Sequence, residues 1–187
     1  MTKTLFATLA AALAAPALAT DAYSVDPHHT YPTFEVRHLG FSTQRGRFNK
    51  TSGRIVLDRQ AKTGSVDIVI DAASVDTGLD KLEEHLRGEE FFNAAKFPTL
   101  TFKSKAVKFS GDKPASVEGD FTMLGVTRPL TLTINAFNCG VHPLNRKEVC
   151  GADAAGVIKR SEFGMTKHVP GVGDEVKLVI QVEAIRE

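Results

Sequence analysis

The sequence predicts an all-β protein, built as an antiparallel barrel or sandwich. Apolar and polar residues alternate along most of the chain, which is typical of strands with one buried face. Clusters of turn-forming residues separate the alternating runs and leave about eight strands. So many strands in one chain must bury their inner faces and hide their edges, which a closed barrel or a sandwich achieves.

The N-terminus has the pattern of a secretory signal peptide. Lys3 precedes an apolar run over residues 5–13, and Ala17 and Ala19 form a small-residue cleavage site. The apolar run is too short to span a bilayer. We therefore expect residues 1–19 to be removed after Ala19, and residues 20–187 to form one exported domain.

The charge balance limits the partners that the domain can have. The chain holds 23 Lys and Arg and 22 Asp and Glu. Since Lys3 lies in the predicted signal peptide, the mature chain has no net charge when His is neutral. The charges are interspersed, so there is no basic block for nucleic acid or for an anionic membrane surface. With no second long apolar stretch, the domain should not span a membrane.

The alternating runs define the inner faces of the expected strands. In the clearest run, residues 33–38, Phe34, Val36 and His38 share one face. Residues 154–165 should form another strand, of ambiguous facing. The other inward sets are Ile55 and Leu57; Val66, Ile68 and Ile70; Leu100 and Phe102; Val107 and Phe109; Val117, Phe121 and Met123; Leu130, Leu132 and Ile134; and Val176, Leu178, Ile180 and Val182.

One stretch has helical periodicity. Asp80 is expected to cap this helix, with Glu83 completing a capping box, and Gly88 to end it. The aromatic cluster of residues 91–98 follows directly. Helix and cluster either line one barrel opening or cover the core without touching a ligand.

Cys139 and Cys150 lie in turn-rich sequence. In an exported protein, an even pair at short spacing predicts a structural disulfide. A metal site that includes His142, which lies between them, is the alternative, but no second ligand pair accompanies it.

Four blocks of sequence together resemble the YceI-like family of periplasmic polyisoprenoid-binding proteins. No single block is decisive, but the four occur in the family's order across nearly the whole mature chain. They are Asp26-Pro27-His28-His29-Thr30 with residues 34–48; Ala73-Ser74-Val75-Asp76-Thr77-Gly78 with His85-Leu86-Arg87, Phe91-Phe92 and residues 97–104; residues 119–129; and Arg160-Ser161-Glu162-Phe163-Gly164-Met165.

The resemblance implies a single antiparallel eight-stranded lipocalin-like barrel that encloses an extended apolar ligand, a polyprenyl or quinone-like isoprenoid or a similar amphiphile. It also implies a periplasmic carrier or storage role, and a functional association with a quinone-oxidising b-type membrane cytochrome. The inward side chains could equally fill a solid core. The candidate ligand-binding residues are Phe34, Val36, His38, Phe48, Phe91, Phe92, Phe97, Phe102, Phe121, Met123, Leu132, Arg160, Phe163 and Met165.

Two of these candidates are polar and leave a choice open. His38 could contact a ligand head group or be a hydrogen-bonded core histidine. Arg160 could bind a head-group phosphate or pair with a carboxylate such as Glu162.

Catalytic motifs are lacking. The sequence has no nucleophile elbow, no H-E-x-x-H and no glycine-rich phosphate loop, so we expect neither an enzyme nor a cofactor. The alternative function is a metal-dependent or hydrolytic enzyme that uses His28, His29 and His38.

Overall fold

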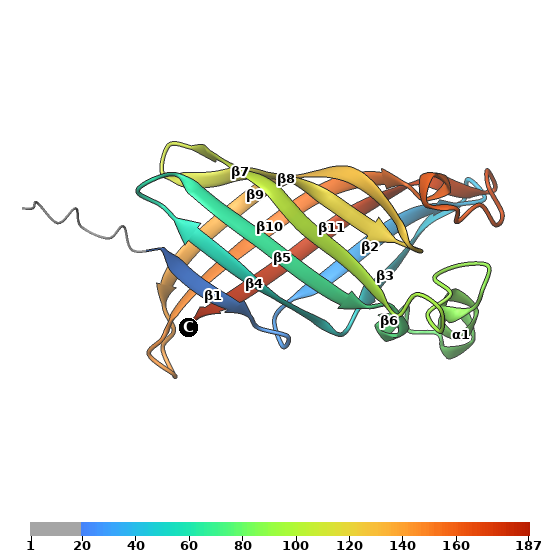
Figure 1. Ribbon diagram of the computed structural model, residues 1–187. Helices are drawn as coiled ribbons and strands as arrows, with labels where there is room; N and C mark the ends of the chain where they lie inside the picture. The colour runs from blue at the N-terminus through green and yellow to red at the C-terminus, as the bar shows by residue number, and fades with distance from the viewer. Residues whose placement is uncertain (1–19) are drawn as a thin grey trace, which may run out of the picture.

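The protein is a barrel of antiparallel strands with one α-helix at one end (Figure 1). The computed structural model describes residues 20–187, so the predicted signal peptide lies outside the described residues. The strands are β1 Asp21–Val25, β2 Tyr31–His38, β3 Ser42–Phe48, β4 Thr51–Asp58, β5 Thr63–Asp71, β6 Val75–Asp76, β7 Thr99–Ser110, β8 Lys113–Met123, β9 Val126–Val141, β10 Glu148–Lys159 and β11 Val172–Arg186. The helical elements are η1 Ala72–Ser74, α1 Asp80–Arg87 and η2 Arg160–Phe163.

The sheet closes on itself. Its pairing runs β1-β4-β5-β7-β8-β9-β10-β11, and β11 pairs back with β1. β1 and β2 lie end to end along β11, and β3 and β4 follow each other along β2 and β1 in the same way. Each of these two pairs therefore occupies one position in the wall, so the barrel has eight positions and the predicted eight-stranded barrel is confirmed.

The break between β1 and β2 was not predicted. Over residues 26–30 the Asp26 carboxylate accepts a hydrogen bond of 2.9 Å from the His28 amide. The Thr30 hydroxyl is bonded at 3.1 Å to both the carbonyl and the amide of Glu183 on β11. These bonds hold the interruption against the neighbouring strand, so the wall stays closed there.

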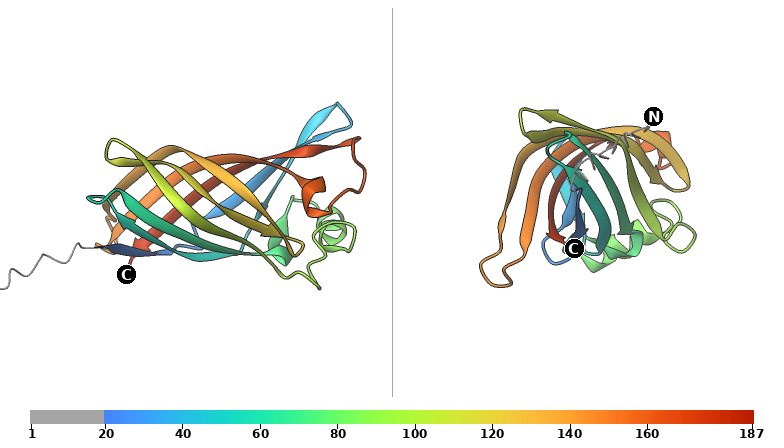
Figure 2. Two further views of the ribbon diagram at one scale, coloured as in Figure 1. Left: turned by 45° about the horizontal axis from the view of Figure 1, so that its top comes forward. Right: turned by 60° about the vertical axis from the view of Figure 1, so that its left-hand side comes forward.

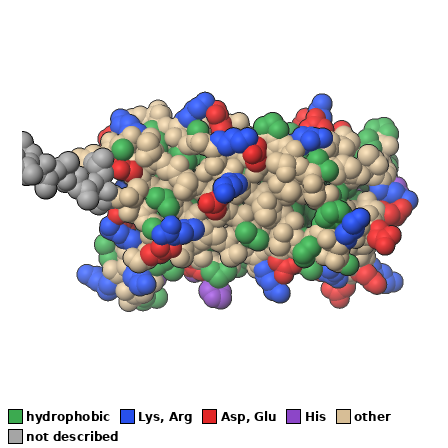
Figure 3. Space-filling model, viewed as in Figure 1, with side chains coloured by type: hydrophobic (Ala, Val, Ile, Leu, Met, Phe, Trp, Pro, Cys, Tyr) green, Lys and Arg blue, Asp and Glu red, His purple; other side chains and the backbone are tan. Residues whose placement is uncertain are grey.

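The two ends of the barrel differ (Figures 1 and 2). At the helix end lie α1, the β2–β3 turn and the segment between β10 and β11. At the terminal end lie the start of β1, the C-terminus and the β9–β10 loop. Between them, the outer wall carries charged side chains of both signs (Figure 3).

The predicted helix is present, but its predicted cap is wrong. Asp80 is the first helical residue, and Leu79 takes the cap position without a side-chain hydrogen bond. The chain turns at Gly78, where φ is 76°, so the amide within reach of Glu83 is that of Thr77, at 2.9 Å. Gly88 ends the helix as predicted.

The strand predicted over residues 154–165 is only partly correct. β10 ends at Lys159, and residues 160–163 form the 3₁₀ helix η2. Its left-handed cap is Gly164, with φ 89°. The chain therefore leaves the barrel wall at Arg160, which accounts for the ambiguous facing in the sequence.

Cys139 and Cys150 form the predicted disulfide. They are directly opposite residues of β9 and β10, near the terminal end.

We expect replacement of both cysteines by serine to lower the unfolding free energy by about 3 kcal/mol, since the bridge restricts the unfolded chain. In a domain of this size the melting temperature should fall by roughly 6 to 12 °C, measured by circular dichroism, with lipid binding retained. Two alkylatable thiols in the unreduced, denatured wild type would contradict the bridge.

Candidate functional site

The barrel is hollow. Its interior contains a cavity of about 240 Å³ that touches nearly every strand of the wall. By the same measure a single water needs only about 10 to 15 Å³. Side chains therefore do not fill the interior.

The cavity has a carbon surface. No polar atom is exposed on it, although Thr30, Thr33, Thr51 and Arg160 contribute to the lining. Of the predicted ligand residues, the following lie on this wall: Phe34, Val36, Phe48, Phe91, Phe92, Phe102, Phe121, Met123, Leu132, Arg160 and Met165. Such a surface offers contact and exclusion of water, and no directed bond.

The other predicted ligand residues lie off the wall. His38 ends β2, where it faces Ser42 and Val172 of the neighbouring strands at the rim of the helix end. Phe163 is 2% exposed and packs against the Phe121 ring, with 5.5 Å between centroids. Phe97 covers the β8–β9 turn, where a Cβ on Gly125 would lie 2.9 Å from its ring.

Three phenylalanines form an aromatic plug near the helix end: Phe34, Phe48 and Phe92. The centroid distances are 5.3 Å from Phe48 to Phe92, 6.0 Å from Phe34 to Phe48, and 6.4 Å from Phe34 to Phe92. Because Phe92 belongs to the segment after α1, this plug joins the cover of the helix end to the barrel wall. Part of the helix and of the cluster reaches the cavity, since Leu86, Phe91 and Phe92 are on its wall; whether they contact a ligand stays a prediction.

A glycine makes room for this plug. Gly46 of β3 lies directly opposite Phe34 of β2. A Cβ at Gly46 would lie 2.4 Å from the Phe34 ring, closer than any side chain can approach. Glycine at this position therefore lets the ring lie across the neighbouring strand.

Arg160 is a buried cation with a structural role. It is 3% exposed and donates hydrogen bonds of 2.9, 3.0 and 2.9 Å to the carbonyls of Gly173, Met165 and Val172. Of the two alternatives, the pairing with Glu162 is not formed; the nearby carboxylate is Asp174. Burial lowers the pKa of Arg160, while Asp174 raises it, and a guanidinium stays charged at neutral pH.

The terminal end is closed by a packed cluster and a layer of charges. Tyr23 is 0% exposed and packs with Leu57, Cys150 and Ala184. Burial is the main cause that raises the pKa of its hydroxyl, and the negative charges of Glu148 and Asp21 raise this pKa further.

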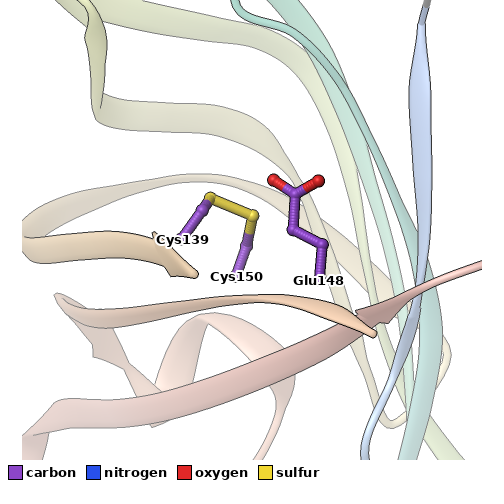
Figure 4. A group of neighbouring side chains, drawn as sticks. All are labelled: Cys139, Glu148 and Cys150. Carbon is purple, nitrogen blue, oxygen red and sulfur yellow. A yellow bond between two sulfur atoms is a disulfide. The ribbon is translucent and has the colours of Figure 1, made fainter. Parts of the chain in front are cut away.

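Glu148 anchors the charged layer over this cluster. It forms ion pairs of 2.9 Å with both Arg59 and Arg186. Figure 4 shows its carboxylate beside the disulfide; Cys139, Glu148 and Cys150 could group around an ion, but both sulfur atoms are bonded to each other. At the helix end the cover is apolar: α1 contributes no buried residue, but Phe91 and Phe92 of the segment after it are 8% and 9% exposed.

Several wall residues were missed by the sequence reasoning. Thr51 lines the cavity, and period-two alternation with Ile55 and Leu57 could have placed it inward. Ala152 and Ala154 line it from β10, but their run of small residues gave no clear facing.

The three histidines of the alternative function do not come together. His28 and His29 lie in the break before β2, whereas His38 lies at the far end of β2, and the strand between them alone spans roughly 23 Å. The His29 Nδ1 is 2.8 Å from the Asp26 carboxylate, and this hydrogen bond raises the pKa of His29. The alternative prediction that His28, His29 and His38 form one site is therefore wrong. Besides the disulfide-bonded Cys139 and Cys150 with Glu148, the group among residues 20–187 with ligand atoms close enough for an ion is Asp26, His29 and Glu183.

Comparison with known proteins agrees with this geometry. The model of the YceI-like domain family matches residues 23–184. Protein YceI of Salmonella arizonae is 35% identical over 168 residues, which cover 88% of this chain and 87% of the relative.

Solved structures show the same fold. BcnA of Burkholderia cenocepacia superposes with a TM-score of 0.71 at 28% identity, over 86% of this chain and 99% of the other. The Campylobacter jejuni YceI protein gives 0.68 at 30% identity, over 81% and 90%. A polyisoprenoid binding domain from Saccharophagus degradans gives 0.63 over 88% and 98%, and at 16% identity this likeness shows the fold alone.

The closed barrel and its carbon-walled cavity define a protein of the lipid-binding barrel class. The chain belongs to the YceI-like family. In the part of the chain that the structure describes, no helix is long and apolar enough to cross a membrane.

The role of Arg160 can be tested by removing its donors. Arg160→Met should lower the unfolding free energy by roughly 3 kcal/mol, because one buried and two partly buried carbonyls lose charged donors. Urea denaturation measures this, and hydrogen exchange should accelerate over residues 164–173. Lys159→Met, an exposed neighbour, is the control. Unchanged stability combined with a selective loss of polyprenyl phosphate binding would contradict the structural role.

Thr51 offers a second test of the wall. Its buried hydroxyl has no hydrogen-bond partner among the described residues. Thr51→Val should therefore raise the unfolding free energy of the delipidated protein by about 1 kcal/mol, because an unpaired polar group is removed. Thr30→Val should do the reverse, since the Thr30 hydroxyl is bonded to Glu183. Thermal melts compare the two; destabilisation by Thr51→Val would show that its hydroxyl has a partner.

Proposed function

We propose that this protein is a periplasmic carrier or store for a long-chain isoprenoid, polyprenyl or quinone-like, held inside the barrel. The observation that carries the proposal is the cavity with no polar atom on its surface. An alkyl chain in water costs about 0.8 kcal/mol per exposed CH₂, so a carrier must offer an interior nearly as apolar as a bilayer. This cavity meets that requirement.

The wall composition favours a branched chain. Phenylalanines and branched aliphatic residues come from opposite sides of the barrel, among them Phe102 of β7, Ile134 of β9 and Leu178 of β11. These side chains offer a rough apolar surface into which methyl branches can pack. Family membership and the polyisoprenoid binding domain of S. degradans support an isoprenoid as the guest.

A ligand head group has no site within the cavity. The guanidinium of Arg160 is turned to backbone carbonyls, and no other polar atom is exposed on the wall. A charged or hydroxylated head would therefore remain outside the carbon-walled region, where water or the rim can solvate it. For the same reason the cavity offers no nucleophile or general base, which supports binding rather than catalysis.

The periplasmic location and the physiological process in this proposal do not depend on the cavity. The signal peptide pattern of residues 1–19 and the resemblance support the periplasm. The functional association with a b-type cytochrome stays a prediction.

The test is whether an isoprenoid occupies and stabilises the barrel. Protein purified without detergent should yield an isoprenoid lipid by mass spectrometry of an organic extract. Delipidated protein should gain melting temperature when polyprenol or ubiquinone is added, because a ligand that binds only the folded state stabilises it. A wild type that holds no lipid and gains no stability from either lipid would end the carrier proposal.

A cavity-filling variant sharpens this test. Ala154 lines the cavity from β10, so Ala154→Phe should occupy the space meant for the ligand. Polyprenol affinity should fall at least about tenfold, or about 1.4 kcal/mol, while the delipidated protein keeps or gains stability because a void is filled.

The matched control is the adjacent residue. Ala155 points to the other face of β10 and is not on the cavity wall. Ala155→Phe should leave polyprenol affinity unchanged. Equal affinities of both variants, measured by ligand-dependent melting, would show that the ligand lies elsewhere.

A further inference from the structure

The β2–β3 turn at the helix end exposes large apolar side chains. Phe41 is 88% exposed and Leu39 is 56% exposed. The turn is firmly held: the Leu39 amide donates a 2.8 Å hydrogen bond to the carbonyl of Gly171 in the segment between β10 and β11. The two apolar side chains are thus presented to solvent by an ordered rim.

The sequence around this turn is cationic. Two segments form this side of the rim, residues 36–48 and 163–173, and neither contains Asp or Glu. Their basic and imidazole side chains are Arg37, His38, Arg45, Arg47, Lys167 and His168. The charges are dispersed along the chain, and the pairing of β2 with β11 brings the two segments together.

Arg37 is the free cation of this rim. Arg45, Arg47 and Lys167 pair with Glu35, Asp76 and Glu90. Within residues 20–187, Arg37 has no carboxylate partner; it donates to the Gly40 carbonyl at 3.1 Å and to the Thr43 hydroxyl at 3.4 Å. Its guanidinium therefore lies against the turn that carries Phe41, with donors left for an anion.

We propose that the β2–β3 turn with the adjoining residues 163–173 is a docking surface for an anionic lipid bilayer. Phe41 and Leu39 enter the boundary between head groups and acyl chains, and Arg37 binds a lipid phosphate. An exposed aromatic side chain beside an arginine suits this membrane interface, since the aromatic ring can enter the apolar acyl region while the guanidinium binds a phosphate in the hydrated head-group region. The proposal rests on the proposed function, because a carrier must take its guest from a membrane.

The position of the surface fits such a transfer. The terminal end is covered by the Tyr23 cluster and the Glu148 ion pairs, whereas the helix end is covered by α1 and by the segment after it, which buries Phe91 and Phe92. Docking through the β2–β3 turn brings this apolar cover next to the lipids. The α1 side of the rim carries Glu84, Glu89 and Glu90, so the hairpin side should face an anionic surface.

The chain has no tryptophan, which allows a direct test. Phe41→Trp places a single fluorophore on the turn. Leu144→Trp is the matched control, since Leu144 is 87% exposed on the β9–β10 loop at the opposite end. With vesicles of phosphatidylglycerol and phosphatidylethanolamine that contain no isoprenoid, emission from the Phe41→Trp protein should shift to the blue and be quenched by brominated lipid. The Leu144→Trp protein should show neither change.

Vesicle co-sedimentation then measures the contribution of each group. Phe41→Ser and Arg37→Gln should each weaken binding to these vesicles about tenfold, and Leu144→Ser should not. Phosphatidylcholine vesicles should bind the wild type more weakly. Equal binding to both vesicle types would overturn the preference for an anionic bilayer, since phosphatidylcholine carries a phosphate but no net charge, and no vesicle binding by the wild type would overturn the docking surface.

The same variants separate this proposal from the carrier function. Phe41→Ser should keep the wild-type gain in melting temperature with added polyprenol, because Phe41 is not on the cavity wall. It should nevertheless load more slowly from vesicles that contain polyprenol. Unchanged loading from vesicles would overturn the docking surface with the carrier function intact, whereas loss of polyprenol stabilisation in the wild type would end the carrier function alone.

Discussion

Closure of the sheet is the constraint on which the other features depend. Because β11 pairs with β1, the sheet closes into a barrel, and an outer edge is left mainly along β3, which meets β6 only at Arg47 and Phe48. Most backbone groups of the wall are therefore satisfied within the wall itself. Only this arrangement allows an interior with no exposed polar atom. The eight positions in the wall also set a width that the inward side chains do not span, which leaves the interior hollow.

The two ends of the barrel are built from different contacts, so the molecule is asymmetric along the barrel axis. One end is fixed by a disulfide, a fully buried tyrosine and ion pairs around Glu148. The other is covered by a short helix and three phenylalanine rings, for which Gly46 leaves room. The terminal end is thus bounded by charged contacts, and the helix end by aromatic ones.

The inward-facing residues of the wall could be predicted from the sequence, because the alternation of apolar and polar residues is visible over a few neighbouring positions. Phe34, Phe102, Phe121 and Leu132 lie on the cavity as the alternation required. What depends on distant partners could not be predicted. Arg160 donates to carbonyls about a dozen residues away in sequence, whereas the sequence left open only a ligand phosphate or a carboxylate.

Other errors had the same origin. Glu83 should have bonded to the cap of its own helix, but the turn at Gly78 gave it the Thr77 amide. His38 follows the inward alternation, yet the strand ends there and places it on the rim. Whether the interior was solid or hollow depended on the closed circumference, which no local pattern contains.

A wall without hydrogen-bonding atoms has no fixed register for its guest. A chain inside the barrel meets the same kind of surface wherever it lies, so it can slide lengthwise at little cost in free energy. Each added segment strengthens binding by a similar amount until the barrel is full. The protein would therefore select ligand chains by their length and width instead of by their head group, and a mixture of chains of different length could share the cavity.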